Sequence, residues 1–303
     1  MNREKIMISA KKVWPSEPYL PIREALGEFV GREPEMRLIV ASWMAGQHSL
    51  PMAPLLVGEP GVGKNRLVYE LARRTARELY IFQGHEDVTA EDLACAVRFS
   101  DTADTRMDYV ISPLVTAMHR GGICFIDEIG KIRPRALALL VSVLDERRYI
   151  DSSLLAERVA AHPGFRFIAA TNSGEIDLLP EFIRSRMRPV IQVGYPPRRE
   201  IDRIIARQCN GLEGRLQELT DLFWTMWEER DQNGHPPSPR DVIHLFGLAA
   251  SMSDVDRLGG QRRLQASGEE APFPTEAQGG GLPDLKSRHL ERAFQKLFPP
   301  QPR

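Results

Sequence analysis

A glycine-rich loop between an apolar segment and a helical one constrains the fold of this chain more than any other feature. The letters GEPGVGKN at 58–65 follow the apolar run PLLV and precede a segment with helical periodicity over 64–77. A strand, a glycine-rich turn and a helix N-terminus in this order bind phosphate, because backbone N–H groups point inward and the helix dipole favours an anion. We therefore expect a nucleotide site here rather than a chance turn. The residues expected to contact the nucleotide are Gly58, Glu59, Pro60, Gly61, Val62, Gly63, Lys64, Asn65 and Arg66.

Position 65 departs from the usual pattern of such loops, G-x-x-x-x-G-K-[ST], in which a hydroxyl holds Mg²⁺. The Asn65 amide oxygen is also a hard ligand, but it lies one bond further from the backbone, and octahedral Mg²⁺ tolerates misplacement poorly. Two interpretations stay open: a magnesium site in which Asn65 is a ligand, and a degenerate site that only binds nucleotide. In both, Lys64 reaches the β and γ phosphates.

Polar side chains follow two further apolar runs. The run ICFI at 123–126 ends in Asp127 and Glu128, and the run at 165–171 ends in Asn172. Buried parallel strands deliver such residues to the edge of the sheet where ligands bind. We expect Asp127 to hold Mg²⁺ through water, Glu128 to polarise the attacking water, and Asn172 to orient it. The alternative is ordinary turn chemistry, in which the acids begin a solvated turn and Asn172 caps one.

Helical and strand periods alternate through the first two thirds of the chain, which predicts an α/β fold with a doubly wound parallel sheet, and only helical periods follow. The fold expected is thus a P-loop sheet domain followed by a small all-helical lid. Predicted strands span 54–58, 78–84, 123–127, 165–172 and 189–195. Predicted helices span 64–77, 113–120, 134–147, 198–209, 215–230, 239–252 and 287–298.

The domain boundaries follow from composition. The pair Pro196-Pro197 marks the seam between the two domains, and Gly, Gln, Glu and Pro dominate from Leu258 to Gly281. We therefore expect five parts. They are an N-terminal extension at 1–20, a nucleotide-binding core at 21–196, a helical lid at 197–257, a flexible linker at 258–285 and a C-terminal helix at 286–303.

Charge and cysteine content exclude several classes of protein. The formal net charge is −1, from 40 Lys+Arg and 41 Asp+Glu, so no broad basic field exists to attract nucleic acid or an anionic membrane. The three cysteines, Cys95, Cys124 and Cys209, form no C-x-x-C pair, which argues against a zinc site or a disulfide scaffold. The N-terminal residues contain no apolar signal region. We expect a cytoplasmic protein that contacts neither nucleic acid nor membrane.

Taken together, these motifs resemble the AAA+ ATPases, and within them the MoxR-like branch that includes the CbbQ/NorQ-type activators, over about residues 22–250. GEPGVGKN resembles Walker A, ICFIDE resembles Walker B and AATN at 169–172 resembles sensor 1. The segment IRSRM at 183–187 is similar to the arginine-finger segment of the family, and SPR at 238–240 to its sensor 2. Two positions depart from the family pattern. One is Asn65, discussed above, and the other is Met187, where the family usually has Phe.

The resemblance implies that ATP and Mg²⁺ bind between core and lid, with Arg240 on the γ-phosphate. It also implies a homo-oligomeric ring, usually a hexamer, in which Arg184 or Arg186 reaches the neighbouring subunit's site. A cation there stabilises the charge on the γ-phosphate oxygens in the transition state. The alternative is that Arg184 and Arg186 are surface charges and Arg240 a solvent-facing residue of a first helical turn.

Two segments, 97–110 and 148–164, interrupt the alternation and resemble the hairpin insertions with which this branch grips a partner. Phe99, Tyr109 and Tyr149 are the candidate contacts, although an aromatic residue in a hairpin more often packs against its own domain. The function expected first is a ring ATPase that remodels or activates a partner protein. In this branch the partner is often a von Willebrand factor A-domain protein or a metalloenzyme awaiting cofactor insertion.

Three other functions are alternatives to this one. A nucleotide-gated assembly scaffold with little or no turnover is supported by Asn65. A nucleic-acid motor is opposed by the net charge and by the lack of a nucleic-acid module. A small-molecule kinase is opposed by Glu128, Asn172 and the paired arginines, since these features suit hydrolysis at a subunit interface.

Overall fold

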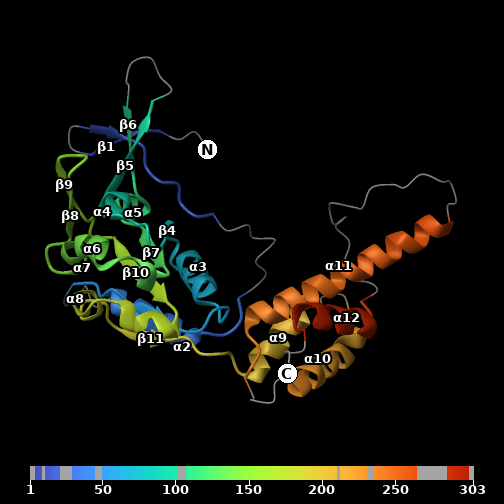
Figure 1. Cartoon of the computed structure of the whole chain (residues 1–303). Coiled ribbons are helices and arrows are strands. Elements are labelled where there is room, and N and C mark those ends of the chain that lie inside the picture. Colours follow the sequence, from blue (N-terminus) through green and yellow to red (C-terminus); the bar gives the residue numbers. More distant parts are fainter. Residues whose placement is uncertain are drawn as a thin grey trace. The chain divides into compact units, whose positions relative to one another are not determined.

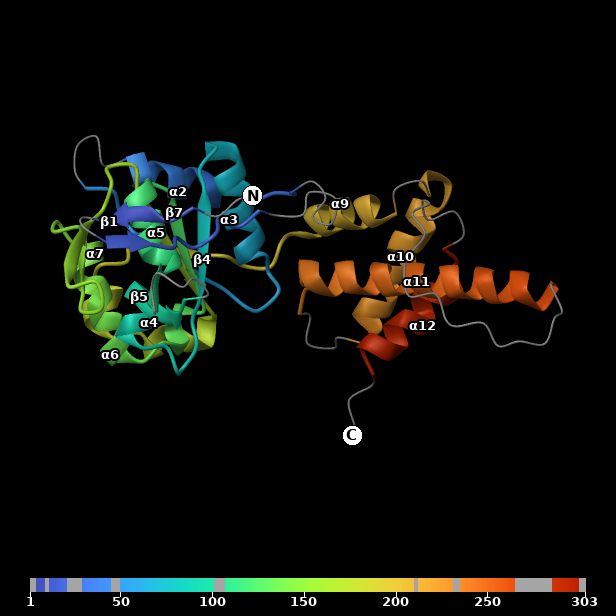
Figure 2. The same cartoon turned by 90° about the horizontal axis from the view of Figure 1, so that it is seen from above.

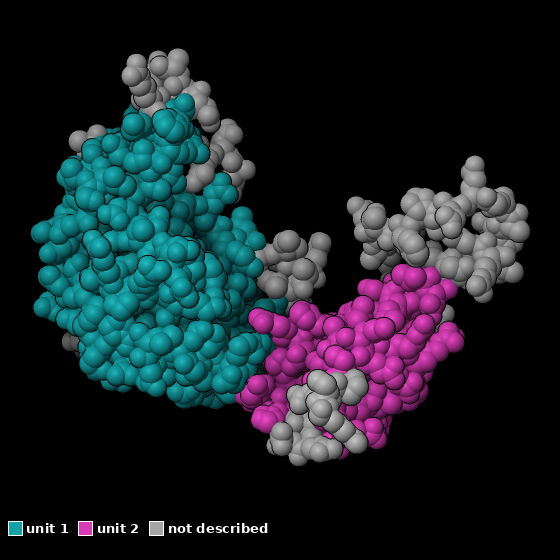
Figure 3. Space-filling view, in the orientation of Figure 1, with its two compact units in different colours: residues 1–194 teal, residues 195–303 magenta. Residues whose placement is uncertain are grey.

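The computed structural model describes residues 4–8, 11–20, 29–44, 50–100, 107–209, 212–230, 235–264 and 285–299. The chain divides into two compact units, Met1–Gly194 and Tyr195–Arg303, coloured separately in Figure 3.

The first unit is built on a five-stranded sheet in which all strands are parallel. Its order is β11-β3-β10-β7-β4 (Figure 1). The strands are β3 (Leu55–Val57), β4 (Leu79–Gln83), β7 (Ile123–Asp127), β10 (Arg166–Thr171) and β11 (Val190–Gln192). Each lies within a predicted strand, so the predicted parallel sheet is confirmed.

Apolar side chains cover both faces of this sheet. Helices α2 (Glu33–Met44) and α3 (Lys64–Thr75) share a core with Leu56, Phe125 and Ile168 on one face. Alternate strand residues such as Ile126 and Ala169 join a second core. That core includes α4 (Ala90–Ala94), α5 (Pro113–Arg120) and α6 (Pro134–Leu137). Because successive strand residues point to opposite faces, continuous apolar runs such as ICFI are what a sheet covered on both sides requires (Figures 1 and 2).

Three antiparallel hairpins accompany the sheet. They are β1 (Ile6–Ile8) with β2 (Lys11–Val13), β5 (Cys95–Phe99) with β6 (Met107–Ile111), and β8 (Tyr149–Ser152) with β9 (Glu157–Ala160). The latter two lie in the segments expected to be insertions; residues 101–106 are outside the described part of the chain. In the expected N-terminal extension, Ile8 and Val13 are buried in the core of the first unit, so this stretch is part of that unit.

The prediction of one continuous helix over 134–147 is wrong. The segment forms α6, a 3₁₀ turn η3 (Ala138–Leu140) and α7 (Val141–Leu144). The backbone becomes extended at Asp145, whose carboxylate accepts the Arg147 backbone N–H at 3.0 Å. This local hydrogen bond competes with the helical one and ends the helix three residues early.

The second unit consists of helices. They are α9 (Arg198–Gln208), the 3₁₀ turn η5 (Glu213–Arg215), α10 (Leu216–Arg230), α11 (Pro239–Leu264) and α12 (Ser287–Leu297). Ser238 and Asp241 cap the start of α11 reciprocally, with hydrogen bonds of 3.0 and 3.2 Å. Leu290 and Phe294 of α12 share one core with Phe223 and Phe246, so the C-terminal helix packs on the helices that precede it. Among the described residues, no helix has both the length and the apolar character needed to cross a membrane.

Helix α11 corrects the predicted linker. It extends through Leu264 and therefore includes residues 258–264, the beginning of the segment predicted to be flexible. The glycines at 259 and 260 each cost about 1 kcal/mol in a helix, but an existing helix adds one hydrogen bond per residue, and Gln, Arg and Leu follow. At the other end of the predicted linker, Leu285 is buried in the helical core. Residues 265–284 lie outside the described part of the chain.

We expect Phe223→Ala to lower the free energy of unfolding of the helical unit by about 3–5 kcal/mol, because it leaves a cavity in a close-packed core. Phe223 is fully buried, and its ring lies 5.2 Å from Trp224 and 6.1 Å from Phe246. Urea denaturation followed by circular dichroism measures the change. The half-exposed Val255→Ala serves as control and should alter the free energy by only about 0.5 kcal/mol. Equal losses for the two variants would contradict this view of the core.

Candidate functional site

The carboxyl ends of three neighbouring strands meet at one edge of the sheet. The loop 58–63 follows β3, Asp127 ends β7 and Asn172 follows β10. Gly63 has φ +100°, in the left-handed region that favours glycine. A Cβ at Gly58 would lie 2.2 Å from the Val193 carbonyl oxygen, so only glycine fits there. The loop enters α3 at Lys64, as a phosphate-binding loop requires.

Lys64 connects this loop to Asn172. Its side chain is buried, and Nζ donates to the carbonyl oxygens of Gly58 at 2.6 Å and Glu59 at 3.1 Å. It also donates to Oδ1 of Asn172 at 3.1 Å. The Asn172 amide nitrogen in turn donates to Glu175 at 3.2 Å, which fixes the orientation of the amide. The predicted phosphate-binding lysine and the predicted water-orienting amide are therefore in direct contact.

Asn65 and Asp127 are also in direct contact. The Asn65 amide Nδ2 donates to Oδ2 of Asp127 at 2.6 Å, and the backbone N–H of Glu128 donates to Oδ1 at 2.9 Å. Burial raises the pKa of Asp127 above its ordinary value, and the two hydrogen bonds oppose this shift. Asp127 and Asn65 are residue types that suit Mg²⁺, but the Asn65 amide presents its nitrogen, rather than its oxygen, to the carboxylate.

Glu128 adopts a left-handed backbone with φ +54°, which is uncommon for a residue other than glycine. Its carboxylate accepts a hydrogen bond from Gln83 Nε2 at 2.9 Å and forms an ion pair with Lys131 at 3.0 Å. Gln83 and Lys131 were missed by the sequence analysis. Gln83 ends β4 and pairs in register with Asp127, so the rule that strand ends converge at one edge could have identified it.

A tyrosine one helical turn after Asn65 was missed as well. Tyr69 is in hydrogen-bond contact with the Asn65 side chain, and its ring centroid lies 4.6 Å from that of Tyr19. Burial raises the pKa of Tyr69 to about 12. Arg66 lies in the same region, and burial lowers its pKa. The Arg66 guanidinium interacts electrostatically with Glu70, Tyr19 and Tyr69.

The two candidate finger arginines differ in their surroundings. Arg184, in α8 (Glu181–Arg184), forms ion pairs with Glu181 at 2.7 Å and Asp177 at 3.2 Å. Arg186 donates instead to the carbonyl oxygen of Phe182 at 2.7 Å. Arg240 is exposed in the first turn of α11, in the second unit.

Comparison with known proteins agrees with these motifs. A family model described as AAA domain (dynein-related subfamily) matches residues 54–187. Protein NorQ of Paracoccus denitrificans is 33% identical over 217 residues, covering 70% of this chain and 78% of NorQ. The chain belongs to the MoxR-like AAA+ ATPases of the NorQ/NirQ type. The denitrification regulatory protein NirQ of Pseudomonas aeruginosa is 30% identical over 204 residues, covering 67% of this AAA+ chain and 73% of NirQ.

Solved structures show the same AAA+ fold. The RuvB Holliday junction branch migration motor of Thermotoga maritima superposes with a TM-score of 0.53 at 17% identity, covering 89% of this chain and 70% of RuvB. The FIGL-1 AAA domain, solved in complex with ADP, gives a TM-score of 0.52 at 16% identity, covering 95% of this chain and 88% of that domain. At these identities the likeness concerns the fold alone.

The aromatic residues expected to contact a partner differ in exposure in this AAA+ protein. The Phe99 side chain is 85% exposed near the end of β5. Tyr109 is half-buried with Lys11 Nζ 5.1 Å from its ring centroid, and Tyr149 lies beneath Arg158 at 3.9 Å. Only Phe99 of the three thus presents most of its surface to solvent.

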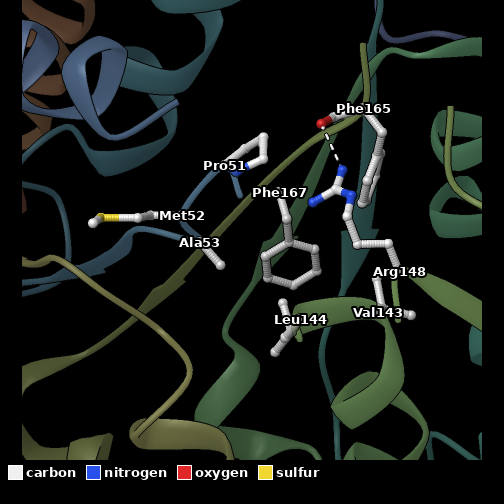
Figure 4. A pocket seen from close by; sticks show the side chains of 8 residues that line it. All are labelled: Pro51, Met52, Ala53, Val143, Leu144, Arg148, Phe165 and Phe167. Carbon is white, nitrogen blue, oxygen red and sulfur yellow. Dashed lines mark hydrogen bonds between the residues drawn. The ribbon is translucent and has the colours of Figure 1, made fainter. Parts of the chain in front are cut away.

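A small pocket lies at the opposite ends of the strands of the AAA+ sheet, away from the loop (Figure 4). Its lining includes Ala53, Phe165 and Phe167, which lie before or at the start of β3 and β10. Beside it Arg148 donates to the Phe165 carbonyl oxygen at 3.2 Å. No residue of the loop 58–65 lines this pocket, so it is separate from the candidate nucleotide site.

Proposed function

We propose that this AAA+ protein binds ATP and Mg²⁺ at the loop 58–65 and hydrolyses the nucleotide to remodel or activate a partner protein. The observation that carries the proposal is the contact of Lys64 with Asn172, next to the contact of Asn65 with Asp127. The residues proposed to recognise phosphate, hold a metal and orient water thus form two hydrogen-bonded pairs, which start from adjacent residues of α3 at one sheet edge.

The side chains have separate roles in this proposal. Lys64 and the loop N–H groups bind the phosphates, and Glu128 accepts a proton from the attacking water that Asn172 orients. Gln83 and Lys131 both contact Oε2 of Glu128, so Oε1 is the oxygen that would accept this proton. Asp127 would hold Mg²⁺, and Asn65 would offer its oxygen to the metal once its amide has rotated away from Asp127. The metal supplies positive charge to the phosphate oxygens when it is bound.

The proposed active form is a ring, as is usual for the family. Arg186, whose guanidinium donates to a backbone carbonyl rather than to a carboxylate, is the better candidate for completing a neighbouring subunit's site. Arg184 is already neutralised by Glu181 and Asp177 of its own chain. Arg240 would contact the γ-phosphate from the helical unit.

The partner proposed is a protein, in keeping with the relatives named NorQ and NirQ, the latter a denitrification regulatory protein. A von Willebrand factor A-domain protein or a metalloenzyme awaiting its cofactor fits this type of ATPase. The exposed Phe99 on the β5–β6 hairpin is the residue proposed to contact it.

Nucleotide binding is tested by Lys64→Ala. We expect a loss of at least about 100-fold in affinity for a fluorescent ATP analogue, because Lys64 is the cation of the loop and charge-assisted contacts are the strong ones. Lys296→Ala, an exposed lysine on α12, is the matched control and should bind as wild type does. Titration by fluorescence anisotropy measures both. Unchanged affinity in Lys64→Ala would place the nucleotide elsewhere.

A second candidate function is a nucleotide-gated scaffold with little turnover. It is favoured by the amide nitrogen that Asn65 directs at Asp127, and by the two donors that already engage Glu128. A steady-state ATPase assay on the assembled protein, with its mass measured by light scattering, decides between the two. Assembly with nucleotide but without turnover supports the scaffold.

A further inference from the structure

The side chain of Asn65 is oriented in a way that differs from the role of a metal ligand. Its amide nitrogen, rather than its oxygen, lies 2.6 Å from Oδ2 of Asp127. An ionised carboxylate can only accept hydrogen bonds, so the group that faces it must be a donor. The amide oxygen, the only atom of the Asn65 side chain that could bind a cation, is therefore the atom that Asp127 excludes from this position.

Neighbouring groups hold the amide in this orientation. Asn65 is the second residue of α3, so its backbone is fixed by the helix. Tyr69 lies one turn further along, in hydrogen-bond contact with the Asn65 side chain, and stacks against Tyr19 with ring centroids 4.6 Å apart. The amide is thus held between a tyrosine on its own helix and a carboxylate on β7.

Asp127 is satisfied on both oxygens by this arrangement. Only 8% of the residue is exposed, Oδ1 accepts the Glu128 N–H at 2.9 Å, and Oδ2 accepts the Asn65 amide at 2.6 Å. A buried carboxylate without such donors is costly, and a cation is the usual remedy. In this chain a protein donor already lies against the carboxylate oxygen.

We propose that Asn65 takes the place of the metal ion on Asp127, so that the loop binds ATP equally well with or without Mg²⁺ and the protein adds little to the affinity for Mg²⁺. The inference rests on the proposed nucleotide binding and concerns how that same site is regulated. Nucleotide occupancy would then follow the ATP concentration alone, and metal entry would require the amide to rotate away from Asp127.

Linkage makes the proposal measurable without an activity assay. The ratio of the dissociation constants for metal-free and Mg²⁺-bound nucleotide equals the ratio of the Mg²⁺ dissociation constants of free and protein-bound nucleotide. A ratio near one means that the protein contributes nothing to metal binding. A ratio well above one means that it supplies ligands.

The experiment measures this ratio with the non-hydrolysable fluorescent analogue MANT-AMPPNP, in EDTA and in excess Mg²⁺. For wild type we expect a ratio within about threefold of one, and for Asn65→Thr a ratio of at least about ten, since a charge-assisted contact to a metal-facing oxygen is worth about this factor. Asn65→Asp, which has the same shape but no donor, should bind the metal-free analogue worst and give the largest ratio.

Asn65→Ala distinguishes two explanations of a ratio near one: that the Asn65 amide substitutes for the metal on Asp127, or that Asn65 is only a poor ligand for Mg²⁺. If the amide stabilises the Asp127 carboxylate by donating a hydrogen bond, removing the amide leaves the nucleotide phosphates near a carboxylate that lacks this donor. Metal-free binding should then weaken about fivefold. Tyr69→Phe should have the same effect to a smaller degree. Thermal melting of each variant shows whether it is folded, and only folded variants enter the comparison.

Two results would overturn the inference. One is a wild-type ratio as large as that of Asn65→Thr, and the other is metal-free affinity in Asn65→Ala equal to that of wild type. Failure of every variant and of wild type to bind the analogue would instead overturn the proposed nucleotide site, and the inference with it.

Discussion

Glu128→Gln is expected to stop ATP hydrolysis while ATP affinity stays within about twofold of wild type. Removing a general base costs typically about 10²–10⁴ in rate, and Glu128 makes no contact with the loop side chains that would bind phosphate. ATP-bound assemblies should then accumulate. The measurement pairs steady-state phosphate release with nucleotide affinity and with the mass of the particle in solution.

The structure also limits the cost of Glu128→Gln to the fold. The new amide oxygen can still accept the Gln83 hydrogen bond, and the lost ion pair with Lys131 joins side chains that are 33% and 39% exposed. Exposed pairs contribute about 0–1 kcal/mol, so the variant should melt close to wild type. Hydrolysis at the wild-type rate would remove Glu128 from the proposed mechanism. Monomers alone in both proteins, with ATP present, would contradict the ring.

Arg186→Ala is expected to retain ATP affinity and to lose on the order of a thousandfold in turnover, because an arginine supplied across an interface stabilises the transition state by about this factor or more. Arg184→Ala is the matched control. Arg184 lies two residues away and is neutralised by Glu181 and Asp177, so its removal should cost much less turnover.

Mixing subunits of two variants distinguishes a residue that acts on the site of a neighbouring subunit from one that acts on the site of its own subunit. In mixed assemblies of Arg186→Ala and Glu128→Gln, some interfaces pair an intact Glu128 with an intact Arg186 from the other subunit. Those interfaces should recover partial ATPase activity. Labelled subunits show whether the mixed assemblies contain both variants. If such assemblies are fully inactive, the result contradicts the proposal that Arg186 acts in trans.

Much of the fold could be predicted because its signals are local. The runs around Phe125 and Ile168 are short, apolar and followed by polar residues, which identifies strands buried on both faces. The glycine-rich loop has a local sequence signal, since Gly63 adopts φ +100°, a conformation that favours glycine. Lys64, Asp127 and Asn172 could be selected for the same reason, since each follows or ends a predicted strand.

Other features could not be predicted because they depend on groups far apart in sequence. Gln83 meets Glu128 only because β4 lies beside β7 in the sheet. Leu285, the last residue of the segment predicted to be a flexible linker, is buried in the helical core together with residues such as Phe223 and Phe246.

The sequence by itself determined that this chain has a phosphate-binding loop, a parallel sheet and acids at its carboxyl edge, since residue types and their spacing set strand, turn and helix directly. Only the tertiary structure decided how those residues engage one another. Asn65 can offer either an oxygen or a nitrogen, and the choice depends on the carboxylate of Asp127, 62 positions later, which accepts hydrogen bonds and so draws the amide nitrogen toward it.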